Sequence, residues 1–501
     1  MSWEDFLLTG RRSPTPMFNG AAECSQEIDV EVQGGKLNLF KNFDMNIIII
    51  QIFVFLIVIC SCCLAQEISF TERSALIAFK SQLILEPTDK LSSNWSSKAH
   101  FCSWFGVSCS NQRVVALKLP GLDLRGTVSP HVANLTRLVE IDLSNKLEGP
   151  LPSELGSLQL LRIFNVTNNS FSGNIPANLS WCKDLEELYI SNSFITGSIP
   201  EEFGLLSNLK ALRLNNNNLT GKVPTSLGNL SKLEYFYLHE NDLNGEIPAS
   251  TADLFSLKLL SFRGNNFSGS IPHSIFNISS LQIVDFSING LSGTLHSDMG
   301  KQLPNLKRLF LDSNRITGEI PSFLSNATKL SYLFFTENDL QGSIPREFGR
   351  MLNMIFLDFE YNRISGNIPS GVFNISSLHI LKTRHNYLSG HLPGDFGKWL
   401  PNLQEIFLSH NLFSGELPST VCNATKLVSL EVSNNSFSGP LPKKLGNLVD
   451  LQHLNLQVNR FVNEPHHSSV PGCLPSSRLD QLDQEKACTG KCHYHCQYGS
   501  S

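Results

Sequence analysis

A segment of about 24 residues recurs along most of this 501-residue chain, and this period restricts the possible folds more than any other feature. The template reads Leu209-x-x-Leu212-x-Leu214-x-x-Asn217-x-Leu219-x-Gly221-x-Val223-Pro224. Fifteen units in phase indicate one continuous repeat structure rather than several globular domains. The units begin at Val114, Leu138, Leu161, Leu185, Leu209, Leu233, Leu257, Leu281, Leu306, Leu330, Met354, Leu378, Leu403, Leu427 and Leu451.

Each residue type that recurs in the template has a physical role in the predicted fold. The Leu-x-x-Leu-x-Leu stretch predicts a short strand whose leucines point into the core while the residues between them face outward. The asparagine turns its amide inward, where an unpaired amide would cost ~2–7 kcal/mol, so stacked repeats should share these amides as a ladder. Leu122 and Ser193 replace it in two repeats, whereas an unbroken run of ten comprises Asn217, Asn241, Asn265, Asn289, Asn314, Asn338, Asn362, Asn386, Asn411 and Asn435.

Residues 113–463 are therefore expected to form an α/β solenoid, a right-handed superhelix of about 15 leucine-rich repeats with a parallel β-sheet on its concave face. Residues 66–112 read as an N-terminal cap. Thr71 is expected to cap a helix that runs to about Leu85, with Pro87 stopping it. Cys102 and Cys109 are expected to form a disulfide that closes the core, two free thiols being the alternative.

The chain ends outside these repeats have different compositions. Residues 1–44 read as an extension without a derivable role, and the apolar run within residues 45–65 reads as a signal peptide, with a retained membrane anchor as the alternative. No second apolar stretch of spanning length follows, so we expect a secreted or cell-surface chain. Residues 464–501 hold cysteines and histidines without repeat pattern; no fold is predicted there, and zinc binding is the alternative.

Composition and motifs argue against some classes of function and in favour of an extracellular protein. The formal net charge of −5 gives no support for nucleic-acid binding or for a polybasic membrane patch. We expect no cofactor and no metal site in the repeats. Thirteen Asn-x-Ser/Thr sequons fit an extracellular glycoprotein: Asn94, Asn134, Asn165, Asn168, Asn178, Asn218, Asn229, Asn266, Asn277, Asn326, Asn374, Asn423 and Asn434.

The sequons also have a predicted geometry. Six of them lie four residues before the first leucine of the next repeat, so their glycans should line one flank or the outer side of the solenoid. Asn165 is the exception, because it should face the concave sheet. Cys182 and Cys422 lie ten repeats apart, roughly 48 Å by strand spacing, so they cannot pair with each other. They are expected to be free or to pair between chains.

The repeats and cap resemble the extracellular part of plant leucine-rich-repeat receptor-like kinases and receptor-like proteins. Ile195-Thr-Gly197-Ser-Ile199-Pro200 matches the plant-type signature, and Cys102-Ser-Trp104-Phe-Gly106-Val107-Ser-Cys109 is similar to the N-terminal module of these families. Two short segments, Leu303-Pro304-Asn305-Leu306 and Ser325-Asn326-Ala327-Thr328, resemble segments of the receptor-kinase group that includes immune sensors of bacterial proteins. The resemblance implies a plasma-membrane receptor in which a membrane span and a serine/threonine kinase follow the ectodomain.

This sequence has no kinase motif set, and we expect no enzymatic activity from it. An Asp395-Phe396-Gly397 triplet occurs, but Phe396 is predicted to be a core residue of the outer side. The resemblance implies a peptide or protein ligand, in immunity or development, and a co-receptor kinase as a further partner. The alternative function is a secreted inhibitor of cell-wall-degrading enzymes, similar to plant polygalacturonase inhibitors.

The ligand-binding candidates come from the outward positions of the predicted strands. Outward aromatic residues are typical of interface hot spots, the alternative being that they stack on one another and shield the sheet. Lys382-Thr-Arg384 is similar to the Arg-x-Arg pair with which some family members hold a peptide carboxylate. The candidates are Tyr189, Arg213, Tyr237, Phe310, Tyr332, Phe334, Phe356, Lys382, Arg384 and Phe407.

Overall fold

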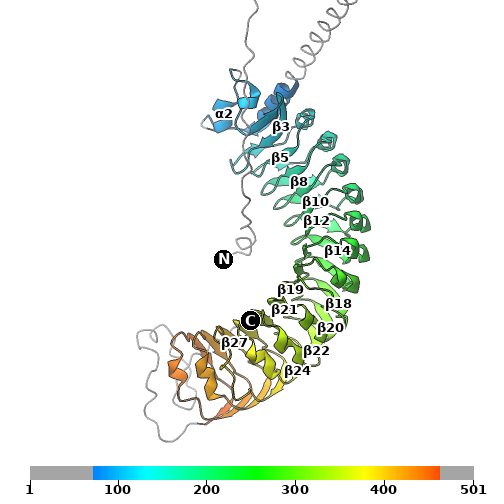
Figure 1. The fold of residues 1–501 in the computed structure, drawn as a ribbon. Coiled ribbons are helices and arrows are strands. Elements are labelled where there is room, and N and C mark those ends of the chain that lie inside the picture. The colour runs from blue at the N-terminus through cyan, green and yellow to red at the C-terminus, as the bar shows by residue number, and fades with distance from the viewer. Residues whose placement is uncertain (1–70, 88, 97, 463–501) are drawn as a thin grey trace, which may run out of the picture. The chain divides into compact units, whose positions relative to one another are not determined.

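A computed structural model describes residues 71–87, 89–96 and 98–462, which form one continuous solenoid of stacked coils (Figure 1). The interpretations of residues 1–44, 45–65 and 464–501 concern segments outside this range. Among the described residues, no helix reaches the length and hydropathy that a membrane crossing needs.

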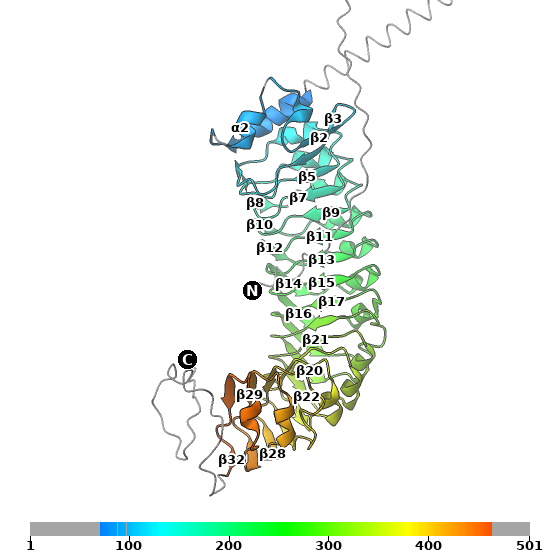
Figure 2. The same ribbon diagram turned by 60° about the vertical axis from the view of Figure 1, so that its left-hand side comes forward.

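A 16-stranded sheet runs along the concave side of the solenoid (Figures 1 and 2), as the repeat predicts. Its first two strands are antiparallel and all later pairs are parallel. In order, the strands are β2 (Val107–Ser110), β3 (Arg113–Lys118), β5 (Glu140–Asp142), β7 (Ile163–Asn165), β9 (Glu187–Tyr189), β11 (Ala211–Arg213), β13 (Tyr235–Tyr237), β15 (Leu259–Ser261), β17 (Ile283–Asp285), β19 (Arg308–Phe310), β21 (Tyr332–Phe334), β23 (Phe356–Asp358), β25 (Ile380–Lys382), β27 (Glu405–Phe407), β29 (Ser429–Glu431) and β31 (His453–Asn455).

A second layer of parallel strands, which we did not predict, follows the ladder asparagine in most repeats. It arises because the residues around the Leu-x-Gly stretch of neighbouring repeats also pair. Nine strands form one sheet: β6 (Glu148–Gly149), β8 (Ser170–Asn174), β10 (Phe194–Gly197), β12 (Asn218–Gly221), β14 (Asp242–Glu246), β16 (Asn266–Ser270), β18 (Gly290–Thr294), β20 (Arg315–Glu319) and β22 (Asp339–Gln341). Five more form a separate sheet: β24 (Ser365–Gly366), β26 (Tyr387–Gly390), β28 (Leu412–Glu416), β30 (Ser436–Gly439) and β32 (Arg460–Phe461).

The outer side of the repeats consists of 3₁₀-helices and not α-helices. In most repeats the residue before the helix is a proline in an extended conformation, and each helix runs for at most five residues, a length typical of 3₁₀-helices. They are η2 (Pro130–Asn134), η3 (Ser153–Ser157), η4 (Ala177–Trp181), η5 (Glu201–Leu205), η6 (Thr225–Asn229), η7 (Ala249–Asp253), η8 (His273–Asn277), η9 (Ser322–Asn326), η10 (Arg346–Arg350), η11 (Ser370–Asn374), η12 (Ser419–Asn423) and η13 (Leu445–Asn447).

Two repeats have an extra residue and form turns in place of this helix. Gly300 and Gly397 lie in these turns with φ of 97° and 87°, a region that side chains disfavour. A Cβ on Gly397 would lie 2.5 Å from the carbonyl oxygen of Thr420 in the next repeat. The insertions are therefore accommodated by glycine at points of close approach between neighbouring coils.

The asparagine ladder forms as predicted and extends beyond the run of ten. Asn362 is representative: its Nδ2 donates to the carbonyl oxygens of Phe335 (2.8 Å), Phe359 (3.2 Å) and Glu360 (3.0 Å), and its Oδ1 accepts from the amide of Leu340 (3.0 Å). The same bonds to neighbouring backbones are made by further members at Asn145, Asn169 and Asn459. Each side chain thus joins two adjacent coils.

The first helix of the N-terminal cap differs from prediction at both ends. It spans residues 71–81 of the described chain and ends before Leu85, because Leu83–Ile84 (β1) pairs antiparallel with Arg125–Gly126 (β4). Thr71, the expected N-cap, is already helical. A second helix, α2 (Lys90–Asn94), and a 3₁₀ turn, η1 (Phe101–Ser103), follow.

Two polar links connect the cap to the first repeat. The buried carboxylate of Glu72 pairs with Nε of Arg113 at 2.6 Å and accepts from the amide of Val114 at 2.9 Å. Within the cap, a disulfide joins Cys102 to Cys109, and the rings of Trp95 and Trp104 stack on each other. The cap therefore covers the open end of the core with buried aromatic residues.

Candidate ligand-binding face

The outward residues of the inner sheet align in straight columns. The predicted column is confirmed residue by residue, since the register pairs Arg213 with Tyr189 and Tyr237 and continues without a shift through Phe310 and Phe334. The central residue of each strand, such as Leu212, is buried. The columns thus place unlike side chains at strand spacing, about 4.8 Å.

One cluster lies near the N-terminal end of this face. The guanidinium carbon of Arg213 is 4.8 Å from the ring centre of Tyr189 and 4.9 Å from that of Tyr237. Burial raises the pKa of both phenols, which stay protonated. Burial, aided by nearby arginines, lowers the pKa of His239 to about 4, so its imidazole is neutral. Arg213 is therefore a cation held in a fixed orientation between two rings.

The Arg213 side chain also has an unused donor. Its Nε is buried and has no hydrogen-bond partner among the described residues. An unpaired buried donor is destabilising by roughly 1–3 kcal/mol, and a bound acceptor would remove that penalty.

An acidic cluster that we did not predict lies in the middle of the face. Ser287 Oγ is 2.7 Å from an oxygen of both Asp285 and Asp312. Burial raises the pKa of Asp285 to about 6 and raises that of Asp312. Arg263 lies 3.9 Å from Asp312 and 3.5 Å from Glu240. The sequence signal was a charged residue two positions after the column residue in some repeats, as at Arg263 and Asp312.

The aromatic cluster is packed rather than fully displayed. Phe334 packs at a tilt against Phe310 (5.1 Å between ring centres) and against Phe356 (4.4 Å). The expectation of exposed rings is wrong for Phe310 and Phe407, which are 7% and 9% exposed because neighbouring side chains cover them. Phe334, Phe356 and Tyr332 are half-buried and keep ring surface open on the concave side.

The two basic candidates, Lys382 and Arg384, lie in different environments. Arg384 makes two hydrogen bonds to Glu360 (2.5 and 3.1 Å) and a longer one to Glu431 (3.4 Å). Lys382 instead lies over two rings, 5.3 Å from the centre of Phe356 and 5.2 Å from that of Phe407. Arg384 is thus already matched with carboxylates, whereas Lys382 keeps its charge toward the concave side.

The sequons occupy several surfaces. Asn165 lies on the concave sheet, where its Oδ1 accepts from the amide and hydroxyl of Thr167. Asn168 and Asn434 lie at the rim with positive φ, and Asn218 and Asn266 begin strands of the second sheet. Asn94 lies in the cap, where it accepts from the amide of Phe105. Asn178 lies in η4; the six others end 3₁₀-helices on the outer side.

The structure bears on the predictions for Phe396 and for the cysteines Cys182 and Cys422. Phe396 of the Asp-Phe-Gly triplet is fully buried against Phe373, which confirms a packing role. Cys182 and Cys422 are buried free thiols, in line with the first of the two alternatives. Burial raises the pKa of the Cys182 thiol to about 11, which disfavours the reactive thiolate.

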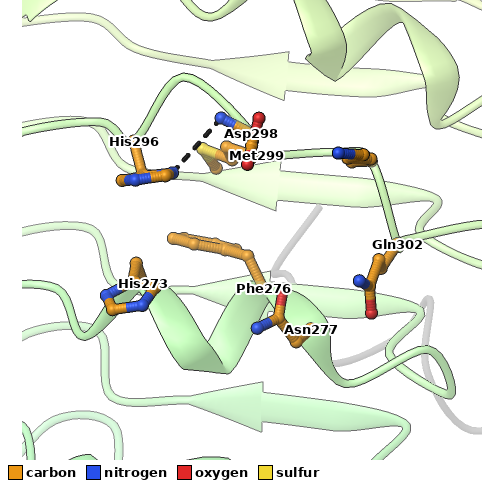
Figure 3. A pocket seen from close by; sticks show the side chains of 8 residues that line it. His273, Phe276, Asn277, His296, Asp298, Met299 and Gln302 are labelled. Atoms are coloured by element: carbon orange, nitrogen blue, oxygen red, sulfur yellow. Dashed lines mark hydrogen bonds between the residues drawn. The ribbon is translucent and has the colours of Figure 1, made fainter.

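A pocket of about 250 Å³ lies away from the concave face, at the first of the two extended repeats (Figure 3). The imidazoles of His273 and His296 stack 5.2 Å apart on one side, and Asn277 lines the other. The amide of Asp298 donates to His296 Nδ1 at 3.3 Å. Within the described ranges no group of three or more His, Cys, Asp or Glu side chains is arranged to hold a metal ion.

Comparisons with known proteins agree with this architecture. A family model for the leucine rich repeat N-terminal domain matches residues 71–110, and leucine rich repeat models match residues 183–243, 256–278, 305–327, 402–424 and 426–448. The LRR receptor-like serine/threonine-protein kinase EFR of Arabidopsis thaliana is 35% identical over 106 residues, which cover 21% of this chain and 10% of that kinase.

Solved structures cover more of the chain. The plant peptide hormone receptor RGFR1 in complex with RGF2 matches with 31% identity and a TM-score of 0.65, covering 67% of this chain and 58% of that one. The Arabidopsis receptor kinase HAESA, in complex with the peptide hormone IDA and the co-receptor SERK1, matches with 29% identity and a TM-score of 0.62, covering 78% and 74%.

The repeat geometry and these matches define the chain as a leucine-rich-repeat protein. Within that class it belongs with the plant leucine-rich-repeat receptor-like ectodomains, whose N-terminal domain and repeats it shares.

Proposed function

We propose that this chain is the ligand-binding ectodomain of a plant receptor-like protein, located outside the cell, which recognises a peptide or protein on its concave sheet. The observation that carries the proposal is the Tyr189–Arg213–Tyr237 cluster, a preoriented cation with an unsatisfied buried donor on an outward column. The chain acts by binding and not by catalysis. The likeness to solved ectodomains with peptide hormones supports this function.

The inner sheet offers chemically distinct subsites along one line. An extended peptide rises about 3.3 Å per residue, so a segment crossing several strands would meet Arg213, then the acidic cluster, then the half-buried rings of Phe334 and Phe356. Lys382 is the better candidate for a ligand carboxylate, because Arg384 is already paired with Glu360. A ligand with an acidic or hydrogen-bond-accepting group, a basic group and an apolar group in this order fits the face.

A second protein partner is part of the proposal. The HAESA structure contains a co-receptor, and a similar co-receptor kinase would join this ectodomain after ligand binding. Whether the signal belongs to immunity or development depends on the ligand, and the concave face supports either.

The test uses a random peptide display library panned against the secreted, glycosylated chain, followed by calorimetry of the enriched synthetic peptides. We expect Arg213→Gln to weaken binding of these peptides at least roughly tenfold, since it removes the preoriented cation. The matched control is Arg315→Gln, the same change on an exposed residue of the second sheet. Equal affinities for the parent chain and the Arg213 variant would contradict binding at this cluster.

A further inference from the structure

The outer flank of the solenoid carries a regular pattern of sequons. Six of them place asparagine at the last residue of a 3₁₀-helix, four residues before the first leucine of the next repeat, and all six are exposed. They are Asn134, Asn229, Asn277, Asn326, Asn374 and Asn423. From Asn229 to Asn423 they occupy every second repeat.

The repeats between these sequons expose apolar side chains at the same flank. Phe255 is 70% exposed, Leu352 65% and Trp399 49%, and Val449, in the repeat after the last of these sequons, is 79% exposed. Each stands at the position equivalent to the sequon asparagine or two residues after it, where the sequon repeats carry serine or threonine. Only the repeat at Gln302 breaks the alternation among these ten repeats. Exposed large apolar groups in a regular row call for a partner that covers them.

Hydrogen bonds place Phe255 directly between two sequons. Ser256 Oγ donates to the carbonyl oxygen of Ser231, the third residue of the Asn229 sequon, at 2.8 Å. Ser280 Oγ donates to the carbonyl oxygen of Phe255 at 2.7 Å, one residue after the Asn277 sequon ends. Phe255 is thereby fixed next to both sequons.

Leu352 has the same arrangement four repeats further along the chain. Asn353 Nδ2 donates to the carbonyl oxygen of Thr328, which ends the Asn326 sequon, at 2.8 Å. Ser377 Oγ donates to the carbonyl oxygen of Leu352 at 2.7 Å, just after the Asn374 sequon. Two independent sites therefore share one geometry.

We propose that N-glycans on alternate repeats cover the apolar side chains of the repeats between them, so that this flank is a sugar-shielded surface. The glycans are those on Asn229, Asn277, Asn326, Asn374 and Asn423. In each transfer the asparagine Nδ2 loses a proton and bonds to C1 of an N-acetylglucosamine, and the lipid-linked diphosphate of the donor oligosaccharide leaves. The inference rests on the extracellular location proposed above.

The experiment begins with the chain secreted from a glycosylating host, with site occupancy measured by peptide mapping. Enzymatic removal of the glycans from the folded chain should raise the fluorescence of a hydrophobic dye roughly threefold and cause self-association in light scattering. Asn229→Gln combined with Asn277→Gln should reproduce part of this effect, and adding Phe255→Ser should abolish that part. Asn218→Gln with Asn266→Gln, on the second sheet, is the matched control and should have no such effect.

The same design at Leu352 uses Asn326→Gln and Asn374→Gln with Leu352→Ser. Unoccupied flank sequons in a secreted chain would overturn the shielding proposal and leave ligand binding intact. Unchanged dye binding after glycan removal, or no rescue by the serine variants, would also overturn it. Circular dichroism of each variant separates these outcomes from misfolding.

Discussion

Arg384 and Glu360, one repeat apart on the concave side, form a two-pronged ion pair with bonds of 2.5 and 3.1 Å. The Glu360 side chain is only 6% exposed, so water contributes little to its solvation and Arg384 is its main polar partner. A residue that looks like a ligand contact in the sequence therefore also stabilises the fold.

This pairing predicts different results for two neighbouring basic residues. Arg384→Ala should lower the free energy of unfolding by roughly 2 kcal/mol, because it leaves a buried carboxylate unpaired. Lys382→Ala should change stability by less than about 1 kcal/mol, as it removes only cation–π contacts, yet weaken binding of an anionic peptide. Urea denaturation and calorimetry measure the two effects. Adding Glu360→Gln to Arg384→Ala should restore most of the lost stability; no restoration would contradict the buried-charge argument.

Asp358 predicts a stability change with pH. Burial, with a further contribution from Glu360, raises its pKa from 3.8 to about 6. Between these values the unfolded chain releases the proton first, so stability falls as pH rises from about 4 to about 6 and is then level for this group. Asp358→Asn should make that part of the profile less steep, with Asp285 still contributing a similar slope, and should raise the denaturation midpoint at pH 7. Asp242→Asn, on the exposed second sheet, is the control; identical profiles for parent and Asp358 variant would refute the assignment.

The extended repeats predict a glycine-specific cost. Gly397→Ala should destabilise the chain by more than roughly 2 kcal/mol, because its φ is 87° and the added Cβ would lie 3.0 Å from Val421 Cα as well as near a carbonyl. Gly394→Ala, three residues away with nothing within 4 Å of its Cβ, should be nearly neutral. Thermal denaturation compares the two. Equal losses would show that turn flexibility, and not close approach, determines the cost.

The amide ladder predicts that adding an asparagine at a ladder position raises the stability of the chain and that removing one lowers it. Ser193 interrupts the ladder, and its buried hydroxyl lacks a partner in the described structure. Ser193→Asn should therefore stabilise the chain by about 1 kcal/mol, while Asn362→Ser should destabilise it by roughly 2–3 kcal/mol. Hydrogen exchange of the flanking amides would locate both effects. A destabilising Ser193→Asn would mean that the local backbone has relaxed around serine.

Periodicity predicted the features that depend on spacing alone. The inner sheet, the column register and the ladder follow from residues 24 apart that occupy equivalent positions. The second sheet was missed because its strands are defined by backbone pairing around Gly and polar residues rather than by an apolar pattern. The burial of Phe310 and the ion pair of Arg384 with Glu360 depend on side chains from adjacent coils, which the apolar pattern of one repeat does not describe. The Arg384 pairing could have been predicted, because Glu360 and Arg384 are 24 residues apart and therefore occupy equivalent positions in neighbouring repeats.

The unshifted register of the inner sheet also makes the coils interchangeable. Leu309, Leu333 and Leu357 pair in sequence across β19, β21 and β23. Deleting residues 330–353, one whole unit, would bring Leu309 opposite Leu357 with core and ladder still in phase. Recognition surfaces of this kind can thus be recombined as 24-residue cassettes, with the boundaries dictated by the hydrogen-bond pattern.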